Sequence, residues 1–363
     1  MMRHNLILIP ALLLACSCAG GDEAQKFLVL GDMHYDLIEN HDLEWLATTK
    51  DDLRQVTQEY TVFTAENWDD FTGVLAEKAV DVDAVLQLGD ISEGLAGTPQ
   101  LAVQMADSVF SAVDRIGFEV PVIITKGNHD ITGPGAREAF DEVYLPNMAR
   151  LSGHDSLSSA NYRTEVGDCC FVCYDPWDKD NHGLDALRDN LAASSAKHKF
   201  VLVHEPVIPI NERCWHVLRR DDEKRAELLR IIAGEEAIVL CAHMHLYSVV
   251  CRDTEYGPIV QLMANSVIRD AGMFKPSYLI TEYGPSLALS RPDWEPETMD
   301  QRVKWLSEEA EHVTYFRQTD LPGYGILEAG PEDGRITYTY YAAFSDEPYD
   351  TVDVTSLIEA CRK

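Results

Sequence analysis

The chain has 363 residues, of which 46% are hydrophobic and 25% are charged, with 22 Gly and 16 Pro. This is the composition of a globular protein with enough apolar residues for a large core, arranged as one elaborated domain or as two small ones. The formal net charge is −31, from 61 acidic and 30 basic residues, which opposes binding to phosphate backbones and argues against nucleic acid polymers as partners.

The N-terminal segment has the pattern of an export signal. Arg3 precedes an unbroken apolar run at Leu6–Ala15, which is too short to span a bilayer as a helix. The run ends in Leu-Leu-Ala-Cys, which resembles the lipobox of bacterial lipoproteins. This resemblance implies that Cys16 is acylated and becomes the new N-terminus, with residues 17–23 as a tether. The alternative is an ordinary secretory signal with an incidental cysteine.

We therefore expect an exported bacterial lipoprotein that is held in the outer membrane by its lipid alone and faces the periplasm or the cell surface. Seven cysteines lie beyond Cys16 and Cys18, so at least one is unpaired or joined to Cys18 if export allows disulfides. Cys170 and Cys173 have the spacing of half a zinc site, but a separation of three places them on opposite faces of a strand. We predict strand and core cysteines whose disulfide partners are open.

The body of the chain alternates apolar runs with amphipathic stretches. Leu101–Ile116 and Asp221–Ala233 are predicted helices, and Gly234 follows the second as a stop signal. This alternation indicates an α/β protein whose strands are covered on both faces. The runs predicted as strands are Phe27–Leu30, Ala84–Leu88, Val120–Thr125, Phe200–Val203 and Ala237–Cys241.

The C-terminal part has a different pattern. Residues 292–312 indicate a helix-bearing insertion in which Met299–Ala310 is amphipathic. Gly323–Glu328 and Ile336–Tyr341 are predicted strands, separated by a turn rich in Gly and Pro.

Residues with metal-binding side chains follow each of the five apolar runs. Ligands of open α/β sheets bind beyond the carboxyl ends of the strands, so we expect these residues to converge on one edge of the sheet. Imidazole, carboxylate and amide oxygen suit Zn²⁺, Mn²⁺ or Fe, and the absence of thiolate argues against a purely structural zinc site. The candidate ligands are Asp32, His34, Asp90, Asn128, His204, His243 and His245. They are too many for one tetrahedral ion and suit two ions that share a carboxylate.

The ordered set of motifs resembles the calcineurin-like metallophosphoesterase family, whose pattern is Asp-x-His, Gly-Asp, Gly-Asn-His-(Asp/Glu), His and Gly-His-x-His. The likeness covers about residues 26–285. It implies a four-layer αββα sandwich, with one metal on Asp32, His34 and His245. The other metal would be held by Asn128, His204 and His243, with Asp90 as the bridge. Ala242 stands where the family usually has Gly, but this difference removes no ligand.

The resemblance also implies catalytic roles for two further residues. His129 would protonate the leaving-group oxygen while a metal-bound hydroxide attacks phosphorus. The family often pairs this histidine with an acid three residues after the bridging Asp, which here is Glu93; a surface glutamate is the alternative. Purple acid phosphatases have Tyr at the position of Glu93, so no iron–tyrosinate site is expected. Asp130 is expected to cap the next helix or brace its loop.

The sequence thus predicts a two-metal hydrolase of a small phosphomonoester or phosphodiester. A nucleotide or cyclic-nucleotide phosphodiesterase is the alternative among enzymes. The alternative outside enzymes is a lipoprotein that keeps the same fold but only binds a small molecule. A protein that has lost catalysis in this way should lack some of the metal-binding residues, and none of them is missing. A metallo-β-lactamase-type hydrolase is excluded because that family needs His-x-His-x-Asp-His, and after His245 this chain continues with Leu246 and Tyr247.

The expected organisation has three segments. Residues 1–23 form the signal and tether, residues 24–285 the catalytic domain, and residues 286–363 the helical insertion with strands that complete the sandwich. The insertion at 35–71 is expected to overhang the site, and Arg219 or Arg220 is a candidate for gripping a phosphate oxygen. The oligomeric state is left open by the sequence.

Overall fold

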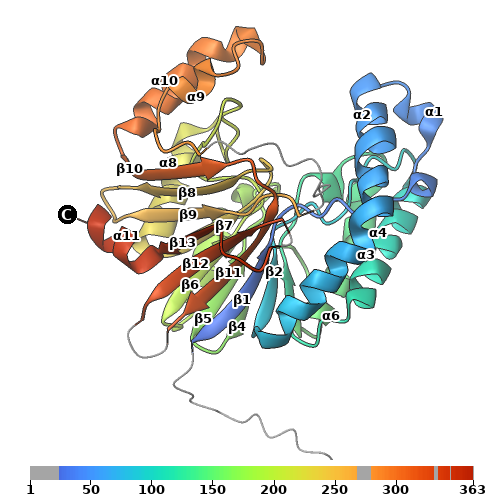
Figure 1. Ribbon diagram of the computed structural model, residues 1–363, viewed down its shortest axis with the longest axis horizontal. Coiled ribbons are helices and arrows are strands. Elements are labelled where there is room, and N and C mark those ends of the chain that lie inside the picture. Colours follow the sequence, from blue (N-terminus) through green and yellow to red (C-terminus); the bar gives the residue numbers. More distant parts are fainter. Residues whose placement is uncertain (1–23, 268–278, 331–333, 344, 363) are drawn as a thin grey trace, which may run out of the picture.

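The computed structural model describes residues 24–267, 279–330, 334–343 and 345–362. The predicted signal and tether, with the lipid attachment predicted at Cys16, lie outside these residues. Two β-sheets stack face to face at the centre, and helices lie against their outer faces (Figure 1). No helix of the described ranges combines the length and the apolar character needed to cross a membrane.

The first sheet is built around β1, which carries the first predicted ligands at its end. β1 runs parallel to β2, and β2 runs parallel to β3, whereas β11 joins the other side of β1 in antiparallel orientation. The strand order is β13 (Asp350–Asp353), β12 (Ile336–Ala342), β11 (Gly323–Ala329), β1 (Gln25–Leu30), β2 (Ala84–Gln87) and β3 (Val122–Ile124).

The second sheet holds the remaining predicted strands. β5, β6 and β7 are parallel neighbours, and β9 continues this parallel set, whereas β4, β8 and β10 pair in antiparallel orientation. The strand order is β10 (Val313–Thr319), β8 (Tyr247–Arg252), β9 (Ile259–Met263), β7 (Ile238–Cys241), β6 (His198–Leu202), β5 (Cys169–Cys173) and β4 (Tyr162–Val166).

Helices cover both outer faces of the sandwich (Figure 1). Those on the first sheet are α3 (Thr61–Lys78), α4 (Pro99–Ile116) and α6 (Leu145–Ser152), with α1 (Leu43–Leu46), α2 (Lys50–Gln55) and α5 (Ala136–Ala139) beside them. Those on the second sheet are α7 (Leu184–Ala192) and α8 (Asp222–Gly234), with α9 (Ser286–Leu289) and α10 (Met299–Ala310) packed together beyond β10. α11 (Val354–Cys361) contacts β8, β9 and β12.

Alternating side chains of the strands build two apolar cores. Phe27 of β1 meets Phe171 of β5 with ring centroids 4.7 Å apart, so the facing surfaces of the two sheets form one core. The neighbours of Phe171, Cys170 and Val172, point the other way and pack under α7 and α8 in a second core. Cys173 returns to the first core, as the spacing of the two cysteines predicted.

The comparison with the sequence confirms the fold class and corrects the arrangement of the strands. All five apolar runs form strands, but they do not share one sheet: β1, β2 and β3 lie in the first, and β6 and β7 lie in the second. The helix predicted to stop before Gly234 includes that glycine, and the left-handed residue that follows is Glu236, with φ of 51°.

Candidate active site

The candidate ligands lie in the loops that directly follow five strands. Those after β1, β2 and β3 come from the first sheet, and those after β6 and β7 come from the second. The loops hold Asp32 and His34, then Asp90, then Asn128 with His129, then His204, and finally His243 and His245. The structure brings all of them together, because the contacts described below join residues of both sheets.

The backbone bends sharply at four of these residues. His34, Asp90, His243 and His245 have φ values of 42°, 50°, 69° and 50°. This left-handed region costs a non-glycine residue about 1–3 kcal/mol, and such strain persists where surrounding structure enforces it, often at functional sites. The strain turns each side chain toward the common centre instead of along its strand.

Two glycines allow the loops to approach one another. A side chain at Gly127 would place its Cβ 2.1 Å from the backbone nitrogen of Asp90. Gly89 has φ of +91°, and a Cβ there would lie 2.7 Å from Nδ1 of His204. Glycine is therefore required at both positions, because any larger residue would push apart the loops that carry Asp90, Asn128 and His204.

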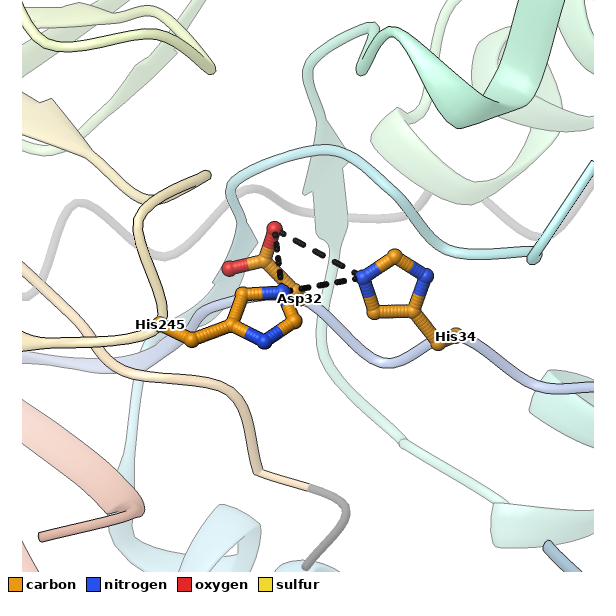
Figure 2. A group of neighbouring side chains, drawn as sticks. All are labelled: Asp32, His34 and His245. Atoms are coloured by element: carbon orange, nitrogen blue, oxygen red, sulfur yellow. Dashed lines mark hydrogen bonds and ion pairs between the residues drawn. The ribbon is translucent and has the colours of Figure 1, made fainter. Parts of the chain in front are cut away.

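The first group of inward-facing side chains consists of Asp32, His34 and His245, which point toward one another (Figure 2). Nε2 of His34 lies 3.1 Å from Nε2 of His245. Oδ1 of Asp32 lies 4.0 Å from the His34 nitrogen and 3.6 Å from the His245 nitrogen. One carboxylate oxygen and two imidazole nitrogens thus face the same small space.

The second group consists of Asp90, His204 and His243, with Asn128 beside it. Nε2 of His204 lies 3.0 Å from Oδ2 of Asp90, 3.1 Å from Nδ1 of His243 and 3.1 Å from Oδ1 of Asn128. Oδ2 of Asp90 also lies 3.9 Å from Nε2 of His34 in the first group. Asp90 therefore lies between the two groups.

The outer nitrogens of the histidines show which inner nitrogens carry lone pairs. Nδ1 of His204 donates to the carbonyl oxygen of Leu88 at 2.8 Å, so its Nε2 is the unprotonated atom in the neutral ring. Nδ1 of His34 lies 2.8 Å from Oε2 of Glu93, and Nε2 of His243 lies 4.0 Å from Oε1 of Glu205. Carboxylates close behind metal-bound histidines orient the ring; Glu93 is close enough to His34 for this, whereas Glu205 is beyond hydrogen-bonding distance of His243.

Imidazole nitrogens thus lie only 3.1 Å apart in each group, Nε2 of His34 from Nε2 of His245 and Nε2 of His204 from Nδ1 of His243. Such an arrangement is repulsive unless a proton or a cation lies between the nitrogens. The donor set of imidazole nitrogen and carboxylate oxygen, buried and already oriented, is the one that divalent transition metals prefer. The residues present therefore fit divalent metal ions.

The charges of the side chains at the centre favour the binding of a cation. Burial raises the pKa of Asp90, but the nearby His204 and His129 lower it well below its usual range. Burial lowers the pKa of His204, but the carboxylates of Asp90 and Asp32 raise it to about 10. Burial holds the pKa of His34 well below its usual value, so this imidazole is neutral and able to bind a metal.

His129 and Glu93 lie together, but not as the sequence led us to expect. Nδ1 of His129 donates to the backbone carbonyl oxygen of Glu93 at 2.6 Å, and the Glu93 carboxylate lies 3.6 Å away. That carboxylate is closer to His34, at 2.8 Å. His129 is half-buried, and it also belongs to a group with His34 and Asp90 compact enough to hold a metal. Its role as a proton donor stays a prediction.

Asp130 braces the loops rather than capping a helix. Its Oδ2 accepts hydrogen bonds from the backbone N–H groups of Gly127 and Asp90, at 2.8 and 3.2 Å. Its Oδ1 accepts from those of Ile91 and Ser92, at 3.1 and 3.3 Å. The buried carboxylate thus ties the loop after β3 to the loop after β2.

Comparison with known families agrees with this geometry. A family model described as calcineurin-like phosphoesterase matches residues 25–247, which is more than half of the chain and includes every candidate ligand. The chain belongs to the calcineurin-like phosphoesterase family. It is therefore a metal-dependent phosphoesterase that uses divalent metal ions.

Solved structures similar to this phosphoesterase have low sequence identity to it. A purple acid phosphatase from seeds of yellow lupin, Lupinus luteus, is 13% identical, with a TM-score of 0.56 over 93% of this chain. The match spans 55% of the lupin chain. A dimetal phosphatase from Danio rerio is 14% identical, with a TM-score of 0.49, over 92% of this chain and 99% of that one. No curated protein matches the chain.

Several residues around the phosphoesterase centre have no motif that would reveal them. Tyr60, from the insertion before α3, lies 4.3 Å from the ring of His34. Trp215 stacks on His243 at 5.3 Å. Aromatic residues in long loops follow no spacing rule, so neither contact follows from the sequence; for Glu205, its place directly after His204 was an available signal.

Two residues of the ligand-bearing loops are buried in contacts of their own. His216 donates from Nδ1 to the carbonyl oxygen of Cys214 and lies against the ring of Trp305. Tyr35, which directly follows His34, packs against Trp68.

Proposed function

We propose that this phosphoesterase hydrolyses a phosphomonoester or phosphodiester at a pair of divalent metal ions. The observation that supports this is the arrangement of two groups of inward-facing imidazole and carboxylate atoms on either side of Asp90. One ion would be held by Asp32, His34 and His245. The other would be held by Asn128, His204 and His243, with the Asp90 carboxylate available to both.

Bound in this way, two divalent ions lower the pKa of water and neutralise negative charge on the phosphate oxygens. The protein contributes the orientation of the ligands. Glu93 lies behind His34, and the carbonyl oxygen of Leu88 holds the outer nitrogen of His204, so these two rings each present an oriented nitrogen to the centre. This removes the need to reorder ligands when substrate binds.

In this proposal His129 supplies a proton to the leaving group. Because its Nδ1 is held by the carbonyl oxygen of Glu93, its Nε2 is the atom that can carry the proton outward. The Glu93 carboxyl group lies 3.6 Å from the same Nδ1. The proton passes to the leaving oxygen as the bond between that oxygen and phosphorus breaks, which is general acid catalysis.

The test is hydrolysis by protein that has been stripped of metal and then reconstituted with Zn²⁺, Mn²⁺ or Fe²⁺. p-Nitrophenyl phosphate and bis-p-nitrophenyl phosphate, assayed side by side, separate monoesterase from diesterase activity. The Asp90→Asn variant removes the shared charge and should lose activity by orders of magnitude. Full turnover by this variant, with its metal content verified, would overturn the two-metal proposal.

We also propose that the enzyme is an outer-membrane lipoprotein processed at Cys16. The apolar run at Leu6–Ala15 and the Leu-Leu-Ala-Cys pattern support this setting. Expression in a Gram-negative host with labelled palmitate should label the wild-type chain and leave Cys16→Ser unlabelled. Equal labelling of both chains, or labelling of neither, would contradict the lipoprotein proposal without touching the enzymatic one.

A further inference from the structure

The loop after β6 places a tryptophan and two arginines beside the metal-binding centre. Trp215 stacks on His243 with ring centroids 5.3 Å apart and an interplanar angle of 28°. The guanidinium groups of Arg213 and Arg219 lie over the Trp215 ring, 5.4 and 5.3 Å from its centroid. Each guanidinium is thus one aromatic ring away from a candidate metal ligand.

These two guanidinium groups contact aromatic rings but lack the polar partners that several other arginines of the protein have. Arg213 also lies over Trp294, 4.6 Å from the centroid of that ring. Both side chains are half-buried, and within the described ranges neither makes a hydrogen bond or an ion pair through its guanidinium. By contrast, Arg225 and Arg252 both pair with Glu309. A guanidinium has five N–H donors, so the two groups together offer ten donors to a ligand.

The nearby carboxylates do not neutralise the pair. Glu212 is taken by Arg291, at 2.9 Å. Glu205 and Glu295 are close enough to act on the charge of Arg219, but neither comes within ion-pair distance of it. In a chain with a net charge of −31, two half-buried cations without an acidic partner form a site that attracts anions.

The loop is held in this shape before any ligand binds. Cys214 and Leu218 have left-handed backbone, with φ of 52° and 59°, a conformation that surrounding contacts must enforce. The buried guanidinium of Arg302 donates to the carbonyl oxygens of Glu212 and Trp294. It thereby ties the loop to the segment before α10, and such preorganisation reduces the entropy that binding costs.

The pair lies beside the reacting centre and not in it. Both guanidinium groups lie over the Trp215 ring, and within the described residues neither makes a hydrogen bond or ion pair with a candidate metal ligand.

We propose that Arg213 and Arg219 bind a second anionic group of the substrate, a phosphate or carboxylate on its organic part, while the reacting phosphate lies against the Asp32 and Asp90 groups. This inference rests on the proposed phosphoesterase function and narrows its substrate to phosphate esters with two anionic groups. Planar guanidinium groups suit both kinds of oxyanion because they can donate two parallel hydrogen bonds. Binding energy gained at this distance from the reacting atoms orients the scissile ester.

The test compares substrates that differ only in the second anion. The first pair is adenosine 5′-monophosphate and adenosine 3′,5′-bisphosphate, which adds a phosphate. The second pair is glycerol 3-phosphate and 3-phosphoglycerate, in which a carboxylate replaces a hydroxymethyl group. In the wild type, the second anion of the preferred pair should raise kcat/KM by about tenfold or more, the effect expected of hydrogen bonds between charged groups.

The variants Arg213→Gln and Arg219→Gln should each remove most of that ratio. Arg220→Gln is the matched control. The sequence offered Arg220 as well as Arg219 for gripping a phosphate oxygen, but Arg220 is exposed, and within the described residues its guanidinium makes no contact with Trp215 or a candidate ligand. This variant should therefore keep the ratio. The inference is overturned if neither pair shows an advantage in the wild type. It is also overturned if the two variants lose activity equally on both members of a pair, because the arginines would then serve the scissile phosphate.

A binding measurement makes this result independent of turnover. Butane-1,4-diphosphonic acid and butylphosphonic acid have C–P bonds that are not hydrolysed, and calorimetry gives a dissociation constant for each. The wild type and Arg220→Gln should prefer the diphosphonate by about tenfold, and Arg213→Gln and Arg219→Gln should not. Equal affinities in all four proteins would refute the inference even when p-nitrophenyl phosphate hydrolysis shows that the enzyme is active.

Discussion

The buried carboxylate of Asp130 offers a direct test of how the centre is assembled. Its two oxygens accept four backbone N–H groups, two each, and these belong to the loops after β2 and β3. In the variant Asp130→Asn, the one remaining oxygen still accepts two of them. The new amide group faces the other two donors with donors of its own, so two buried N–H groups lose their acceptor.

The magnitude follows from the cost of leaving a buried donor unpaired, which is about 1–3 kcal/mol each. Two such donors predict a loss of about 2–6 kcal/mol in the free energy of unfolding, a large fraction of the stability of a typical protein. Because one donor is the backbone of Asp90, the variant should also bind metal more weakly. The effect is therefore expected in both stability and metal affinity.

Urea denaturation with excess chelator measures the stability without a contribution from bound metal. Asp221→Asn is the matched control. Asp221 is an exposed residue that caps α8 by accepting from the backbone of Lys224, at 3.0 Å, and Asn caps helices as well as Asp does. The control should change stability by less than about 0.5 kcal/mol. An equally small change in Asp130→Asn would refute the bracing role.

Three further predictions concern single side chains. His129→Ala should lower kcat by about 10²–10⁴-fold and leave metal content near that of the wild type; loss of metal, measured by elemental analysis, would show that His129 is a ligand. Glu93→Ala should weaken metal binding by about 10–100-fold, and Glu93→Gln by less because it keeps an acceptor for His34; equal affinities by calorimetry would contradict this. Burial raises the pKa of Glu309, but Arg225 and Arg252 lower it below its ordinary value, so its stabilising contribution is complete above pH about 4.3 and is lost as the pH falls further. Glu309→Gln should therefore cost about 3–5 kcal/mol at pH 7 and far less at pH 3, as seen in urea titrations at each pH; a difference that does not depend on pH would argue against the ion pair.

The sequence predicted the candidate ligands because their chemistry is visible locally. Asp32 and His243 each follow a short apolar run after one residue, and Asn128 follows one after two residues; the structure does bring these positions together. Their assignment as ligands stays a prediction. The polarity of parallel strands explains why Asp32 and Asn128 lie at the same edge of the first sheet, whereas the approach of His243 depends on how the two sheets stack.

The division of the strands between two sheets was not predictable in the same way. β1 and β7 are both short apolar runs buried along their length, and nothing in such a run states which neighbour it pairs with. The pairing of Gln25 with Ala329 joins residues at opposite ends of the chain. Sheet membership is therefore a property of the whole fold and not of the local pattern.

The direction of the Glu93 side chain escaped prediction for a related reason. Its spacing from Asp90 placed it near His129, and its backbone carbonyl does contact that ring. The carboxylate turns to His34 instead, because side-chain direction depends on the strained turn at Asp90 and on the second loop that packs against it. Spacing alone gives the neighbourhood of a residue, not the atom that it contacts.

The position of β1 between β2 and β11 has a consequence for how the enzyme is made. A chain that ends at residue 285 contains every candidate ligand but lacks β11, so the strand that leads to Asp32 and His34 would be an edge strand with unpaired backbone groups. We expect such a fragment to aggregate instead of binding metal. Metal loading should thus wait until β11 has paired with β1.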